Sequence, residues 1–153
     1  MKKNDIENLT AYCGLYCGDC IRYKSKASDL AKDILKEFEK TNFSEYAKVK
    51  KAEMPQMEQF EAAIHVLRTV SQIQCALPCR LGGDGCGGSC PVIECVKENK
   101  RQGCWECSDF KMCGKLDFLK TFHGEAHLKN LQKIKDMGID AWIKHREKCY
   151  PWL

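Results

Sequence analysis

Cysteine is the residue type that decides what chemistry this chain of 153 residues can perform, because twelve cysteines occur in it. Eight of them lie between Cys75 and Cys113, and three more belong to the N-terminal motif CGLYCGDC at residues 13–20. Two cysteines separated by two residues can reach one ion from a single tight turn, and the sequence contains Cys17-x2-Cys20 and Cys104-x2-Cys107. The sequence therefore predicts that thiolates from the two segments meet around metal.

The predicted metal ligands are the closely spaced cysteines of these two segments. Each CxxC pair needs two further thiolates to complete a tetrahedron. The expected ligands are Cys13, Cys17, Cys20, Cys86, Cys90, Cys95, Cys104, Cys107 and Cys113. Which of them share an ion stays open. Cys75 and Cys79 follow a helix end, where ligation and packing explain them equally well, and Cys149 beside the terminal aromatic residues is expected to pack.

We expect about two zinc ions in a mainly structural role, because all-cysteine zinc sites are usually closed. The alternative is an iron–sulfur cluster or a redox-active thiol pair, since clusters too are held by thiolates. The spacing Cys13-x3-Cys17-x2-Cys20 also resembles the signature of radical S-adenosylmethionine enzymes. Those enzymes are built from repeated strand–helix units, and the sequence shows no such alternation.

No catalytic residue is predicted, and an enzyme is less expected than a binding protein. His123 and His127 are spaced so that one helix face could present both imidazoles to a metal. However, the sequence has no HExxH motif, and isolated helical histidines are more often surface or core residues. Ligation by these two histidines is therefore left open.

Composition bounds the partners and the compartment. The formal net charge is +4, but a four-thiolate zinc site carries about −2, so two such sites bring the chain close to neutral. Lysines alternate with acids along the expected helices, which is typical of a solvated face rather than a nucleic-acid interface. No apolar run approaches the roughly 20 residues that span a bilayer, and no export signal is visible. We therefore expect a cytoplasmic protein, where thiols stay reduced, without membrane binding. Nucleic-acid binding is not indicated, and the partner is unknown, with a protein as one candidate.

The fold class is predicted to be mainly α, with about five helices packed around a small irregular metal-centred region and few or no strands. Ser28 is expected to cap a helix that packs through Leu30, Ile34, Leu35 and Phe38. The other expected helices cover residues 55–74, 92–99, 116–122, 126–137 and 139–148. Residues 1–153 are expected to form a single domain in which the motif at residues 13–20 folds onto the cluster at residues 75–113.

Four segments together resemble a known family. They are YCGLYCGDC, CPVIEC, GCWECSDFKMC and FHGEAHLKNL, spread over nearly the whole chain. This combination resembles the small prokaryotic cysteine-rich proteins grouped as domain of unknown function 3795. The resemblance implies zinc binding and no assigned activity. Together with the residue pattern, it leads us to expect a zinc-stabilised binding or adaptor module.

Overall fold

The chain divides into two compact units, each described here by itself. The computed structural model describes residues 3–83, 85–86, 88–148 and 150. One unit combines Met1–Lys24 with Cys75–Leu153, and the other is Ser25–Gln74. The predicted mainly α class is confirmed, because within the described residues the only β pairing is an isolated bridge between Thr10 and Tyr16. None of the described helices is both long and apolar enough to cross a membrane.

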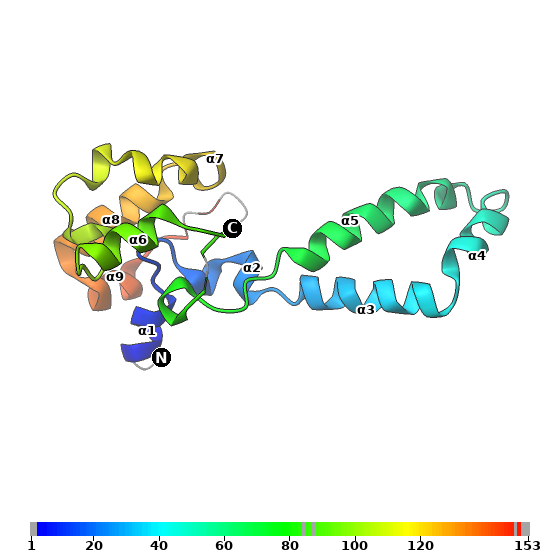
Figure 1. The fold of residues 1–153 in the computed structure, drawn as a ribbon, viewed down its shortest axis with the longest axis horizontal. Coiled ribbons are helices and arrows are strands. Elements are labelled where there is room, and N and C mark those ends of the chain that lie inside the picture. The colour runs from blue at the N-terminus through cyan, green and yellow to red at the C-terminus, as the bar shows by residue number, and fades with distance from the viewer. Residues whose placement is uncertain (1–2, 84, 87, 149, 151–153) are drawn as a thin grey trace. The chain divides into compact units, whose positions relative to one another are not determined.

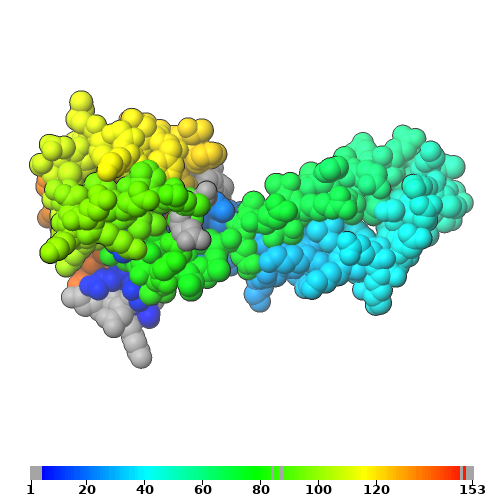
Figure 2. Space-filling model, viewed as in Figure 1, coloured from blue at the N-terminus to red at the C-terminus, as the bar shows by residue number. Residues whose placement is uncertain are grey.

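The unit Ser25–Gln74 is a helical hairpin. It contains α3 (Ala27–Lys40), α4 (Phe43–Lys50), a 3-10 turn over Pro55–Gln59 and α5 (Phe60–Gln72). Helices α3 and α5 lie side by side, and their side chains meet along the hairpin (Figures 1 and 2). The rings of Phe38, Phe43 and Phe60 pack together near the turn, with centroids 4.7 to 5.4 Å apart. The predicted start at Pro55 is confirmed as the first position of a helical turn.

The contact between α3 and α5 corrects two details of the prediction. Ser28 lies inside α3 instead of capping it, and its buried hydroxyl donates a hydrogen bond to the carbonyl oxygen of Val70 at 2.8 Å. Leu30 and Ile34 were expected inside, but 64% and 41% of their surface is exposed. The physical reason is that small residues let two helices approach closely, and Ser28 and Ala31 are the buried residues of α3.

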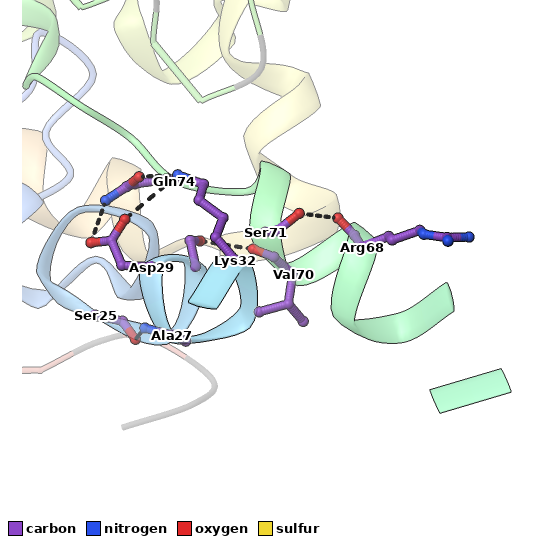
Figure 3. A network of polar contacts seen from close by, with 9 residues as sticks. Ser25, Ala27, Asp29, Lys32, Arg68, Val70, Ser71 and Gln74 are labelled. Atoms are coloured by element: carbon purple, nitrogen blue, oxygen red, sulfur yellow. Dashed lines mark hydrogen bonds and ion pairs between the residues drawn. The ribbon is translucent and has the colours of Figure 1, made fainter. Parts of the chain in front are cut away.

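Polar side chains close the open end of the hairpin. The amide of Gln74 donates to Asp29 at 3.0 Å and accepts a hydrogen bond from the Lys32 ammonium group at 2.9 Å (Figure 3). These three exposed side chains hold the start of α3 beside the residues that follow α5. The hairpin therefore has polar contacts at one end and an aromatic cluster at the other.

The cysteine-containing unit is built from short helices joined by irregular backbone. Its helices are α1 (Lys3–Leu9), α2 (Ile21–Lys24), α6 (Pro91–Glu98), α7 (Lys120–His123), α8 (Ala126–Met137) and α9 (Ile139–His145). Its 3-10 turns are Cys17–Asp19, Cys79–Leu81, Cys104–Glu106, Phe110–Met112 and Gly114–Leu119. The expected helix at residues 116–122 is thus divided between a 3-10 turn and α7.

The core of this unit consists of apolar side chains from both of its chain segments. The most buried members are Leu15, Tyr16, Val92, Val96, Phe110, Leu116, Leu119, Leu131, Ile134 and Trp142. The predicted helix at residues 126–137 is confirmed as α8, which turns Leu131 and Ile134 inward and ends before Gly138, whose φ of 79° is in the region that favours glycine. Several cysteines pack against this core, so it supports the sulfur-bearing loops directly.

Candidate metal centre

Seven cysteines line one cavity of about 60 Å³ in the cysteine-containing unit. They come from both of its chain segments and are Cys13, Cys17, Cys20, Cys75, Cys79, Cys86 and Cys90. Tyr12, Arg22, Tyr23 and Phe118 line other parts of the wall. We call this feature the seven-cysteine cavity. It brings the N-terminal motif and the loop that follows α5 to a common space.

The other four described cysteines form a second set, the four-cysteine group, around Cys104. Its members are Cys95, Cys104, Cys107 and Cys113. The pKa of Cys104 is raised to about 12, first by burial and then, in decreasing order, by the neighbouring thiols of Cys113, Cys95 and Cys107. Cys90 also acts on Cys104, so the two sets of thiols adjoin each other.

The thiols surround space instead of converging on one point. Within residues 3–83, 85–86, 88–148 and 150, no three His, Cys, Asp or Glu side chains are placed so that they could hold a metal ion as they stand. Metal binding by either set would therefore require the thiols to turn toward a common centre. A change of side-chain rotamer is sufficient for such movement when the backbone already brings the cysteines together.

The thiols of Cys13, Cys17 and Cys86 keep their protons in the absence of a cation. The pKa of Cys17 is raised to about 12, mainly by burial and to a smaller extent by the neighbouring Cys79 and Cys20. Burial also raises the pKa of Cys86 to about 11, and it raises that of the buried Cys13 well above the usual value. A thiol must lose its proton to bind metal, so a bound cation would replace these protons. The thiols of Cys13, Cys17 and Cys86 are thus uncharged without a cation and would become thiolates on binding metal.

The N-terminal motif is held by two long-range contacts. Tyr150 accepts a hydrogen bond from the backbone N–H of Tyr16 at 2.7 Å and donates its hydroxyl to the carbonyl oxygen of Tyr16 at 3.0 Å. Asp19 forms a buried ion pair with Arg146. Because Tyr16 and Asp19 flank Cys17, these contacts fix the turn that presents the first CxxC pair.

Close backbone packing shapes the loop between Cys75 and Cys90. The N–H of Gly83 donates to the carbonyl oxygen of Pro78 at 3.1 Å, and a Cβ atom on Gly83 would lie 2.0 Å from the carbonyl oxygen of Leu77. Only glycine fits such an approach. The loop therefore folds back on its own backbone between Leu77 and Gly83.

Arg80 joins the two sets of cysteines. Its guanidinium carbon lies 4.5 Å from the ring centre of Tyr12 and 5.2 Å from that of Trp105. The same group donates hydrogen bonds to the carbonyl oxygens of Thr10 and Gln102. The N–H of Cys104 adds a direct bond to the carbonyl oxygen of Tyr12 at 2.9 Å, so the segments beside Cys13, Cys79 and Cys104 are tied to one another.

The structure distributes all nine predicted ligands between the two sets. Cys13, Cys17, Cys20, Cys86 and Cys90 line the seven-cysteine cavity, and Cys95, Cys104, Cys107 and Cys113 form the four-cysteine group. Cys149 lies outside the described residues. Metal binding by the nine residues stays a prediction. The structure adds which of the nine cysteines lie near one another.

Two cavity cysteines, Cys75 and Cys79, were outside the predicted ligand set. A signal for them was present in the sequence, because Cys13-x3-Cys17, Cys75-x3-Cys79 and Cys86-x3-Cys90 repeat one spacing. The three pairs with this spacing, together with Cys20, are the seven cavity cysteines. The spacing thus marks the cavity better than the distance of a cysteine from a helix end does.

His123 and His127 do not line the cavity. His127 is completely buried, and neither of its ring nitrogens has a hydrogen-bond partner among the described residues. The His123 ring packs edge-on against the ring of Tyr150, with centroids 5.5 Å apart. The structure therefore separates the two imidazoles from the seven thiols and places His127 in the core.

Comparison with known proteins agrees with the resemblance found in the sequence. The chain belongs to the family described as Protein of unknown function (DUF3795), which matches residues 9–118. The matched region contains every cysteine of the seven-cysteine cavity and of the four-cysteine group. No curated protein and no solved structure matches the chain.

Proposed function

We propose that this chain is a zinc-binding protein in which bound metal links its two cysteine-bearing segments. The observation that carries the proposal is the seven-cysteine cavity, where cysteines from residues 13–20 and residues 75–90 line one space. Buried cysteines that serve only as small apolar residues would not need to gather around a cavity. Thiolates are the preferred ligands of structural zinc.

The four-cysteine group supports zinc independently. Zinc in structural sites is four-coordinate, and this group offers four thiols, those of the partly buried Cys104 and its three neighbours. The turn Cys104–Glu106 places Cys107 one residue beyond its end, with the N–H of Cys107 donating to the carbonyl oxygen of Cys104 at 3.0 Å. Such a tight turn presents two sulfurs to one ion. Cys95 on α6 and Cys113 then complete the set.

The proposed role of the zinc is structural, and the proposed role of the protein is that of a binding or adaptor module in the cytoplasm. Catalysis by a metal-bound water needs an open coordination position and a base that removes a proton. Among the described residues that line the cavity, none carries a carboxylate or an imidazole. Cytoplasmic conditions would keep the eleven described free thiols reduced and ready to bind metal.

The test is elemental analysis of the full chain after anaerobic purification, together with its visible absorption spectrum. We expect zinc, no colour, and a melting temperature that falls when a strong chelator removes the metal. Cys104→Ser should lose zinc, whereas Ser71→Ala on α5 should keep the parent zinc content. Iron with acid-labile sulfide and a brown colour would overturn the proposal in favour of a cluster protein.

A further inference from the structure

The number of thiols in the cavity does not fit zinc ions bound one at a time. One tetrahedral ion uses four ligands, so a single zinc would leave three of the seven thiols unused. Two separate ions would need twice four ligands, which is one more than the described residues of the cavity supply. The described residues of the wall include no histidine, aspartate or glutamate that could provide the missing ligand.

A shared thiolate resolves the mismatch. When one sulfur bridges two ions it fills a position on each, and the other six thiolates each fill one position. Seven thiolates then complete two tetrahedra with no position left open and no thiol left over. We propose that the seven-cysteine cavity holds two zinc ions joined by one bridging thiolate, while the four-cysteine group holds a third ion. This inference rests on the zinc binding proposed above.

The charges around the cavity support a centre of this kind. Loading releases one proton from each thiol to solvent, and seven thiolates with two Zn²⁺ ions leave a charge of −3 on the centre. Arg22 lines the cavity, and its guanidinium group donates a hydrogen bond to the carbonyl oxygen of Cys86. Arg80 adjoins Cys79. Burial raises the pKa of the Cys79 thiol, and the positive charge of Arg80 lowers it. The two-ion centre would carry more negative charge than a four-thiolate zinc site, and it would lie beside these two arginines.

The chain also supplies the close approach that a two-ion centre needs. Gly85, with a φ of 83°, lies so near Cys90 that an added Cβ would be 3.0 Å from the Cβ of Cys90 and 3.6 Å from its sulfur. The loop that carries Cys86 can therefore come close to the start of α6. A compact centre shared by residues from several turns requires this kind of approach.

The decisive experiment is metal counting combined with cadmium NMR on the full wild-type chain. Elemental analysis is expected to give three zinc ions per chain. After replacement of zinc by the spin-active cadmium isotope, three resonances are expected, and two of them should be split by cadmium–cadmium coupling through the shared sulfur. Two ions per chain, or three resonances without coupling, would overturn the bridged centre and leave zinc binding itself intact. A chain that binds no zinc would instead contradict the proposed function.

Two variants assign the ions to their thiols. Cys107→Ser in the four-cysteine group should leave two ions and preserve the coupled pair of resonances. Cys149→Ser is the matched control and should retain three ions, whereas loss of an ion would overturn the assignment of the centre to seven thiolates. If Cys107→Ser fails to fold, the wild-type spectrum still decides, because the coupling is measured without any substitution.

Discussion

The guanidinium group of Arg146 binds both carboxylate oxygens of Asp19, with its Nη2 atom 2.8 Å from Oδ1. Only 16% of the Arg146 side chain and 7% of the Asp19 side chain are exposed. The guanidinium carbon also lies 4.2 Å from the ring centre of Tyr16. Arg146 therefore anchors a carboxylate that sits between the two cysteines of the first CxxC pair.

Removing Arg146 should destabilise the protein strongly. Arg146→Met leaves the Asp19 carboxylate buried without its partner, and we expect the free energy of unfolding to fall by about 3 kcal/mol. The double variant Arg146→Met with Asp19→Asn should recover part of this loss, because no uncompensated charge remains. Urea unfolding of the single and double variants in a double-mutant cycle measures both effects. A double variant less stable than Arg146→Met would contradict the interpretation.

Replacing Arg80 should loosen the connection between the two sets of cysteines. Arg80→Met would leave the carbonyl oxygens of Thr10 and Gln102 without their charged donor and remove two cation–π contacts. We expect a loss of about 2 to 3 kcal/mol in unfolding free energy. Arg80→Lys keeps the charge but not the planar fork, so it should fall between the parent and Arg80→Met. Equal stability of Arg80→Met and the parent in urea unfolding would disprove the connecting role.

Gly14 should tolerate no side chain. Its φ is 83°, and an added Cβ would lie 2.9 Å from the Cγ of Leu131 and 3.0 Å from the carbonyl oxygen of His127 on α8. Gly14→Ala should therefore cost about 2 to 4 kcal/mol through backbone strain and overpacking together. Gly82 has a φ of 95° but open space around its Cα, so Gly82→Ala should show the strain alone, about 1 to 2 kcal/mol. Thermal unfolding of both variants tests whether α8 packs on the backbone beside Cys13.

His127 should make the protein sensitive to acid. The pKa of His127 is lowered mainly by burial and also by the nearby His123 and Lys120. The carboxylates of Asp117 and Glu125 raise this pKa, but by less. Because the folded-state pKa lies below the unfolded value of about 6.5, the unfolded chain binds the proton more tightly. The stabilisation by neutral His127 is thus complete above about pH 6.5 and is lost as the pH falls below it.

The variant His127→Leu isolates this effect. It keeps an apolar side chain in the core and removes two ring nitrogens that have no partner among the described residues, so its stability at neutral pH should match or exceed that of the parent. The difference in unfolding free energy between variant and parent should grow in favour of the variant as the pH drops. A difference that stays constant across this pH range would show that His127 does not carry the acid sensitivity.

The features that could be predicted from the sequence are those set by local chemistry. Pro91 at the first position of α6 and Gly138 at the end of α8 define helix limits by their own backbone preferences. The inward direction of Leu131 and Ile134 follows from helical periodicity within one segment. The tight turns that join Cys17 to Cys20 and Cys104 to Cys107 were foreseeable for the same reason, since cysteine spacing is a local property.

The features that could not be predicted depend on partners far away in the chain. Leu30 was expected to be buried, but its exposure is decided by which face of α3 meets α5, and the small Ser28 and Ala31 take that face. The place of Cys75 and Cys79 in the cavity depends on the fold of the loop around Gly83 and on Arg80, which binds segments distant in sequence. Periodicity within one segment carries no information about such contacts.

The hydrogen bond between the N–H of Cys75 and the carbonyl oxygen of Arg22, 2.8 Å long, brings together the two places where the cysteine-containing unit is interrupted by the hairpin. The hairpin is therefore an insertion whose ends already meet, and the cysteine-bearing framework closes without contributions from the length of the hairpin. Because the entropy of closing a loop grows only slowly with the number of residues in it, evolution could lengthen, shorten or replace the insertion at little cost to that framework. The chain thus separates one chemical demand, the placement of sulfur, from a segment whose length that placement does not constrain.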